Sequence, residues 1–139
     1  MILIDNRSDE ELPEEEYLAL AAFVVDNESQ SEDSELSISL VNQDEIHTLN
    51  REYRGIDAPT DVLAFENDGE LLGDVVVCPT VAREHAGEFD SSFESEMYLM
   101  LIHGILHLLG YDHIVDRDAE LMEARENELL ELWKEVSTR

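Results

Sequence analysis

Cysteine and basic residues are scarce in this sequence. Cys78 is the one cysteine among 139 residues, so no disulfide can form within the chain, which fits a reducing compartment. We interpret Cys78 as a small buried apolar residue and not as a nucleophile. Lysine and arginine together number 8 against 35 aspartates and glutamates, which gives a formal net charge of −27. A general basic surface for nucleic acid is therefore excluded, because affinity for phosphates comes largely from Lys and Arg. Phosphate contacts would have to come from a few local arginines or from a bound metal ion.

Long hydrophobic runs are also missing. The longest apolar stretch, residues 97–109, is interrupted by two histidines and a glycine. It is too short to cross a bilayer and predicts a buried core helix. Residues 1–17 are acidic and lack the basic and long apolar regions of a signal peptide. We therefore expect a soluble cytoplasmic protein with no membrane association, and we interpret the acidic surplus as a device for solvation in a crowded or salty cytoplasm.

The pattern of apolar residues predicts an α+β fold. Hydrophobic residues make up 43% of the chain, which is enough for a single domain spanning residues 1–139. The elements, taken from apolar periodicity and from capping and turn residues, follow the order β-α-β-α-β-β-α-α-α. We expect a small four-stranded mixed sheet with helices packed against it. The expected strands are 2–4, 36–41, 62–65 and 74–78, and the expected helices are 13–25, 42–54, 79–89, 92–109 and 118–137.

Two signals set expected helix ends. Asn42 is expected to cap the second helix, with Glu45 as the reciprocal partner of a capping box. Ser91 or Ser92 is expected to start the long apolar helix, and Gly110 to end it.

Three histidines stand in the most apolar part of the chain, in HGILHLLGYDH, residues 103–113. His103 and His107 are four apart, so on a helix they share one face and can direct two nitrogens at one ion. Gly110 allows the chain to turn back, which would return His113 to the same point. Three imidazoles leave a coordination position open on zinc, which is typical of a catalytic site.

Two alternatives to this hypothesis have different weight. Histidines in an apolar helix are often buried core residues, but each then needs a hydrogen-bond partner, and the neighbouring sequence offers none. The spacing H-x-x-x-H-x-x-G-x-x-H also matches the ligand frame of metzincin proteases. Those proteases carry a glutamate as general base where this chain has Gly104, so peptide hydrolysis by their usual route is disfavoured.

Three blocks of the sequence resemble the YbeY family of bacterial endoribonucleases, in the family's order. LNREYRGIDAPTDVLAF, residues 49–65, resembles the family's L-N-x-x-Y-R…P-T-D-V-L-S-F block, and LLGDVVVCP, residues 71–79, resembles its L-G-D-I-x-I block. HGILHLLGYDH resembles its H-G-x-L-H-L-x-G-Y-D-H signature and is the most specific of the three. Two positions depart from the family pattern: Ala64 replaces the usual Ser, and Glu66 the usual Pro.

The resemblance implies a metal-dependent hydrolase with one Zn²⁺ per chain on His103, His107 and His113. It implies cleavage of single-stranded RNA, maturation of the 3′ end of small-subunit ribosomal RNA, and ribosome quality control. The expected partners are single-stranded RNA within a ribosomal particle and a ribosomal or GTPase protein. The family's functional arginine falls on Arg54.

The residues also single out Arg54. Between residues 36 and 115 the only cations are Arg51, Arg54 and Arg83. A guanidinium suits phosphate because it can donate two parallel hydrogen bonds. The residues alone nevertheless favour the alternative, a surface ion pair to one of the many acids. Together with the family resemblance, they lead us to predict Arg54 as the phosphate ligand with Arg51 as its helper.

Other candidates are weaker. Asp61 and Asp74 precede or begin strands and either orient Arg54 or a histidine, or cap a turn. Asp112 either orients a ligand or caps the Gly110 turn. His47 and His85 are interpreted as ordinary surface residues.

The sequence leaves two other functions open. The first is another metal-dependent hydrolase, including a protease with an unusual base. The second is a non-catalytic ribosome-associated protein whose metal only stabilises the fold, which the charge of −27 favours because naked RNA would be repelled from most of the surface.

Overall fold

The computed structural model describes residues 1–28, 35–66, 71–111 and 116–137. Its four strands, β1 (Ile2–Asn6), β2 (Glu35–Leu40), β3 (Val62–Glu66) and β4 (Leu71–Val77), form one sheet in the order β1-β2-β4-β3. β1, β2 and β4 run parallel, and β3 pairs antiparallel with β4, so β1 and β3 form the two edges. The expected α+β fold with a mixed four-stranded sheet is confirmed, together with the order of its elements.

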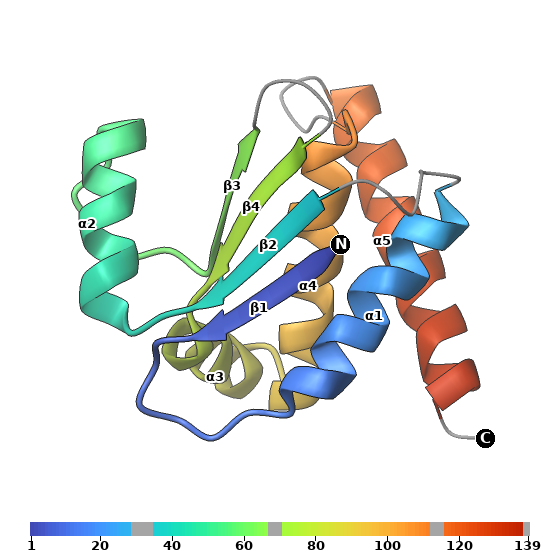
Figure 1. The fold of residues 1–139 in the computed structure, drawn as a ribbon, viewed down its shortest axis with the longest axis horizontal. Coiled ribbons are helices and arrows are strands. Elements are labelled where there is room, and N and C mark those ends of the chain that lie inside the picture. The colour runs from blue at the N-terminus through green and yellow to red at the C-terminus, as the bar shows by residue number, and fades with distance from the viewer. Residues whose placement is uncertain (29–34, 67–70, 112–115, 138–139) are drawn as a thin grey trace.

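Helices cover the two faces of the sheet unequally (Figure 1). α1 (Glu14–Asn27), α4 (Phe93–Leu108) and α5 (Asp116–Ser137) lie on one face, and α2 (Gln43–Arg54) lies on the other. α3 (Pro79–Glu88) follows β4 directly and packs against α4. In the part of the chain that the structure describes, no helix is long and apolar enough to cross a membrane.

The alternation of residues in the central strands produces two cores. Leu36, Ile38 and Leu40 of β2 are buried in the larger core with α1, α4 and α5. In β4, Val75 faces this core, whereas Val76 faces a smaller core beneath α2. Since both faces of β4 are covered here, its last three residues, Val75–Val77, are all apolar and do not alternate with polar residues.

α4 is the central helix and is apolar on most of its surface, as expected for a helix inside a core. Gly104 allows it to lie close to the sheet, because a Cβ at this position would be 2.6 Å from Val75 Cγ1 and 3.3 Å from Val62 Cγ2. The residue that stands where metzincins carry a catalytic glutamate is therefore a packing residue at the contact between α4 and the sheet.

The ends of α4 follow the sequence signals. The Ser92 hydroxyl accepts a hydrogen bond from Ser95 N–H at 3.0 Å, which caps the helix and selects Ser92 over Ser91. Gly110 follows the last turn with φ +103°, a conformation that favours glycine.

The predicted capping box of α2 is wrong. Asn42 occupies the N-cap position without a side-chain cap, and its Oδ1 accepts instead from Asp9 N–H at 3.0 Å. Glu45, its expected reciprocal partner, pairs with Arg7, whose Nε lies 3.2 Å from Glu45 Oε2. Contacts from the loop after β1 therefore replace the local cap.

Candidate active site

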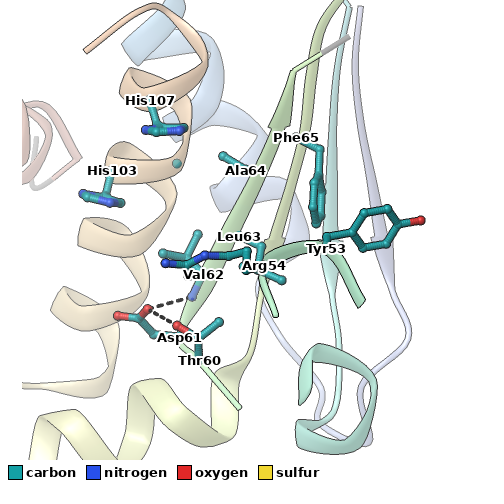
Figure 2. A pocket seen from close by; sticks show the side chains of 11 residues that line it. Tyr53, Arg54, Thr60, Asp61, Val62, Leu63, Ala64, Phe65, His103 and His107 are labelled. Carbon is teal, nitrogen blue, oxygen red and sulfur yellow. Dashed lines mark hydrogen bonds between the residues drawn. The ribbon is translucent and has the colours of Figure 1, made fainter. Parts of the chain in front are cut away.

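A pocket of about 670 Å³ opens between α4 and the edge strand β3 (Figure 2). Four consecutive residues of β3 line it, and because side chains of a strand alternate between faces, the pocket wraps around the strand edge. The other lining residues come from the end of α2, the turn before β3, and α4. The full set is Tyr53, Arg54, Thr60, Asp61, Val62, Leu63, Ala64, Phe65, His103, Gly104 and His107.

The backbone of β3 is open toward this pocket. Cys78 N–H donates to Asp61 O at 2.9 Å, and the antiparallel register pairs Val62 with Val77 and Ala64 with Val75. Residues of an antiparallel strand alternate between bonding to the neighbour and facing away, so Val62 and Ala64 direct their N–H and C=O groups to the open edge. Val62 N–H is satisfied there by Asp61 Oδ1 at 2.8 Å.

His103 and His107 lie one turn apart on α4, and both rings line the pocket. The four-residue spacing thus places them on one face, where two ring nitrogens can approach one ion. His113 and Asp112 lie outside the described residues, so the third ligand stays a prediction. Among the residues that the structure does describe, no group of three or more His, Cys, Asp or Glu side chains is placed to hold a metal ion.

Glu126 of α5 is the site residue that sequence reasoning missed. His103 Nδ1 donates a hydrogen bond to its Oε1 at 2.5 Å, and the carboxylate is buried. This hydrogen bond raises the pKa of His103 against the opposing effect of burial. A signal existed: Met122, Glu126, Leu129 and Trp133 follow one another at spacings of four, three and four on the buried side of α5. A carboxylate at a core position of an amphipathic helix requires a partner.

The histidine pair fits a zinc site. His103 Nδ1 donates to Glu126, and a carboxylate on one ring nitrogen is the usual arrangement in metal sites, because it fixes the tautomer and the ring orientation so that the other nitrogen can bind the metal. Imidazole nitrogens are preferred ligands of Zn²⁺. The apolar side chains of Val62 and Ala64 line the facing wall.

Arg54 is the cation of the pocket. Its side chain points from the end of α2 toward α4 (Figure 2), and its Nη1 donates to Asn50 Oδ1 at 3.5 Å. Asn50 is itself buried and donates to Ala58 O at 2.8 Å, which ties the turn before β3 to α2. Among the described residues, no carboxylate forms an ion pair with Arg54.

The other two cations of this region are occupied by acids. Arg51 does not line the pocket and lies 3.9 Å from Asp57 Oδ1, so the structure gives no support to its expected role as a helper. Arg83 pairs with Glu10 and lies over the Phe93 ring at 3.9 Å. Arg54 is therefore the guanidinium left available for a phosphate in this region of the described chain.

Asp61 caps the start of β3. Its Oδ1 accepts from Val62 N–H at 2.8 Å and from the Thr60 hydroxyl at 3.2 Å, which supports the capping alternative. Its Oδ2 lies 3.7 Å from Nδ1 of His85, which is partly exposed and does not line the pocket. Its negative charge also contributes, more weakly than Glu126, to the raised pKa of His103.

The remaining candidates lie away from the pocket. Asp74 pairs with Phe65 in the β3–β4 register and does not line the pocket. His47 Nε2 lies 2.8 Å from Asp57 Oδ1 on the exposed side of α2. Cys78 is fully buried, and burial raises the pKa of its thiol, as expected for an inert core residue. Of the two departures from the family blocks, Ala64 lines the pocket and Glu66 is exposed at the end of β3.

Comparisons with known proteins place the chain in a family. Residues 3–134 match the family model described as Endoribonuclease YbeY. Proteins of that name from Bacillus subtilis and Syntrophotalea carbinolica are 39% and 44% identical to this chain, over 91% and 93% of it and over 88% and 93% of their own lengths. The solution structure of TM1509 from Thermotoga maritima is 35% identical, superposes with a TM-score of 0.70, and covers 99% of this chain and 93% of its own. The chain therefore belongs to the endoribonuclease YbeY family.

Proposed function

We propose that this protein is a zinc-dependent endoribonuclease that cleaves single-stranded RNA. The family supports the reaction class, since the relatives are named endoribonucleases. The observation that carries the proposal is the joint position of His103, His107 and Arg54, which forms no ion pair with a described carboxylate, in one pocket of a chain with a net charge of −27. An arginine without an ion pair among the described residues, beside a histidine pair, suits an anionic substrate.

His103 and His107 would hold the metal, with His113 as the third ligand. A bound Zn²⁺ would supply a Lewis acid for a phosphate oxygen and lower the pKa of a coordinated water. Glu126 orients the His103 ring through the 2.5 Å hydrogen bond. Arg54 binds the scissile or a neighbouring phosphate through its two parallel N–H groups and offsets charge that develops on the phosphate oxygens.

The site lacks the protease base. Gly104 stands where a metzincin glutamate would be, and of the described lining residues only Asp61 carries a carboxylate. Asp61 Oδ1 is engaged by Val62 N–H, so its first role is to hold the strand start. The attacking group, water or the ribose 2′-hydroxyl, is left open by the proposal.

The negative charge of the chain affects how it can bind its RNA substrate. Most of the surface repels free RNA, so we propose that the RNA is presented by a ribosomal particle or by a ribosomal or GTPase protein partner. The proposed substrate is the 3′ end of small-subunit ribosomal RNA during maturation and quality control, in the cytoplasm.

The direct test is cleavage of single-stranded RNA by the native protein and by the His103→Ala and Arg54→Ala variants. The native protein and Arg54→Ala are compared at equal zinc content per chain. We expect His103→Ala to lose cleavage and Arg54→Ala to cleave at least about 100-fold more slowly. His47→Ala and Arg51→Ala are matched controls, since both residues lie on α2 outside the pocket lining. Equal cleavage by all five proteins would identify a contaminating nuclease and contradict the proposal.

One observation favours a second candidate, a metal-dependent peptidase. The open edge of β3 beside the histidines is the kind of strand with which an extended peptide pairs. Gly104 argues against this candidate because it removes the usual base. Turnover of casein that zinc stimulates and a chelator abolishes would favour the peptidase over the nuclease.

A further inference from the structure

The charge of the molecule limits how it can bind RNA. Single-stranded RNA usually owes much of its affinity to Lys and Arg contacts, but the described pocket lining offers Arg54 as its only cation. If the proposed function holds, the charged contacts are limited to Arg54 and the metal ion, so much of the affinity of the pocket must come from contacts that involve no charge. Stacking of nucleobases on aromatic rings is the main contact of this kind in single-strand binding.

An aromatic pair lies at the pocket rim next to Arg54. Tyr53 precedes Arg54 on α2, and its side chain is 67% exposed. Its ring contacts the Phe65 ring edge-on, with centroids 5.2 Å apart and an interplanar angle of 62°. Both residues line the pocket that contains the two histidines.

The pair is held in position by the fold. Phe65 packs against the smaller core beneath α2, which includes Leu63 and Val76. Tyr53 rests on Phe65 and is otherwise open to solvent. A large apolar ring that is fixed at one edge and exposed elsewhere loses little conformational entropy when a base stacks on it.

The aromatic pair and the histidines lie on opposite sides of Arg54 (Figure 2). In Figure 2 the Arg54 side chain points toward α4 and the Tyr53 ring points the opposite way. A strand of RNA with one phosphate on Arg54 can therefore run toward the histidines on one side and reach the aromatic pair on the other.

We infer that Tyr53, backed by Phe65, is a stacking site for an unpaired nucleobase of the RNA, next to the phosphate bound by Arg54. The inference rests on the proposed function, because it assigns the base that accompanies the phosphate in the same pocket. The base lies outside the stretch between Arg54 and the histidines, so the site sets affinity and the requirement for unpaired RNA without taking part in bond cleavage.

The test is binding of a short fluorescein-labelled single-stranded RNA to the zinc-loaded protein, followed by anisotropy at low temperature while a gel shows that the RNA stays intact. We expect Tyr53→Ala to weaken binding about tenfold and Tyr53→Trp to retain it, because stacking needs a ring and not the hydroxyl. Phe89→Ala is the matched control, since Phe89 is 69% exposed, contacts His85 edge-on at 5.9 Å and does not line the pocket. The affinity should depend weakly on salt, with a log–log slope of about −0.7 for one phosphate.

A second readout identifies the contact itself. RNAs with a single 2-aminopurine placed at each position in turn should show one position whose fluorescence is quenched by the native protein and not by Tyr53→Ala. An abasic site at that position should weaken the binding of RNA to the native protein. It should leave the affinity of Tyr53→Ala for the RNA unchanged. Equal affinities of native protein, Tyr53→Ala and Phe89→Ala, or quenching that survives Tyr53→Ala, would overturn the inference.

Cleavage kinetics distinguish a failure of the stacking site from a failure of the proposed nuclease function. If the proposed function holds, Tyr53→Ala raises KM for short single-stranded RNA and leaves kcat within about twofold. Cleavage with an unchanged KM would overturn the stacking site and leave the nuclease intact. No cleavage by any protein, together with the Tyr53-dependent binding, would overturn the nuclease and support the stacking site as part of an RNA-binding surface.

Discussion

Glu126 occupies a position on α5 that an apolar residue normally takes. Burying a carboxylate costs free energy unless it is paired and hydrogen-bonded, and here His103 Nδ1 provides the partner. The same contact orients the His103 ring for the proposed metal. At the residue scale, the candidate site therefore depends on a side chain 23 positions beyond the histidine that it supports.

Replacing Glu126 tests this role without touching the ligands. We expect Glu126→Gln to weaken zinc affinity by about 10–100-fold, because the neutral amide is a poorer acceptor for the imidazole N–H and makes the ring less basic. Competition with a fluorescent zinc chelator measures this directly. Glu123→Gln, at an exposed position on the same helix, is the control and should bind zinc as the native protein does. Equal zinc affinities of the two variants would mean that Glu126 serves packing alone.

At the scale of elements, α4 carries a packing residue, Gly104, directly next to a candidate metal ligand, His103. Gly104 lies between His103 and His107 in sequence, and its missing side chain sets how closely the helix approaches β4. The distance from the histidines to β3, and hence the width of the pocket, depends on this contact.

Gly104→Ala should therefore damage the site through packing. The added methyl group would meet Val75 Cγ1 at 2.6 Å, so either the Val75 side chain or α4 itself must shift. We expect a loss of about 1–3 kcal/mol in the free energy of unfolding, although alanine is the better helix former, and a lower kcat/KM. Urea unfolding of the metal-free protein measures the first. Gly87→Ala on α3 is the control, since a Cβ there meets nothing within 4 Å, and it should be neutral or stabilising. A Gly104→Ala protein as stable as Gly87→Ala would contradict the packing role.

The sequence predicted best what local residues decide. The Ser92 cap and the apolar alternation of β2 depend on neighbours in sequence, and both are observed. The capping box at Asn42 failed because Asp9 N–H and Arg7, distant in sequence, compete for its two side chains. Glu126 was missed for the same reason, since its partner is set by how α5 packs on α4.

The pocket itself was only partly predictable. The spacing of His103 and His107 predicts that they share one helix face. The role of Arg54 was predicted from the scarcity of basic residues together with the family resemblance. Sequence could not show that Arg51 turns to Asp57 while Arg54 stays clear of acids, because both arginines lie on the last turn of α2. That distinction depends on the path of the turn before β3, which Asn50 fixes through Ala58.

At the scale of the whole molecule, the charge of −27 acts on every element. Self-repulsion among 35 acids destabilises the compact state and is screened by salt. We expect the melting temperature to rise steadily as KCl increases from low to molar concentration. Sucrose at matched water activity is the control for effects unrelated to ionic screening. An unchanged melting temperature across the KCl series would remove the idea that the acidity suits a salty cytoplasm.

The central claim is that His103, His107 and His113 together hold one metal ion, and metal content per chain tests it most directly. Elemental analysis of the purified protein should give about one zinc ion per chain, and His103→Ala, His107→Ala and His113→Ala should each lose most of it. His47→Ala, which removes a histidine on α2 outside the pocket lining, should keep it. A native protein without stoichiometric metal after purification and zinc reconstitution, or full zinc content in each of the three folded variants, would contradict the account.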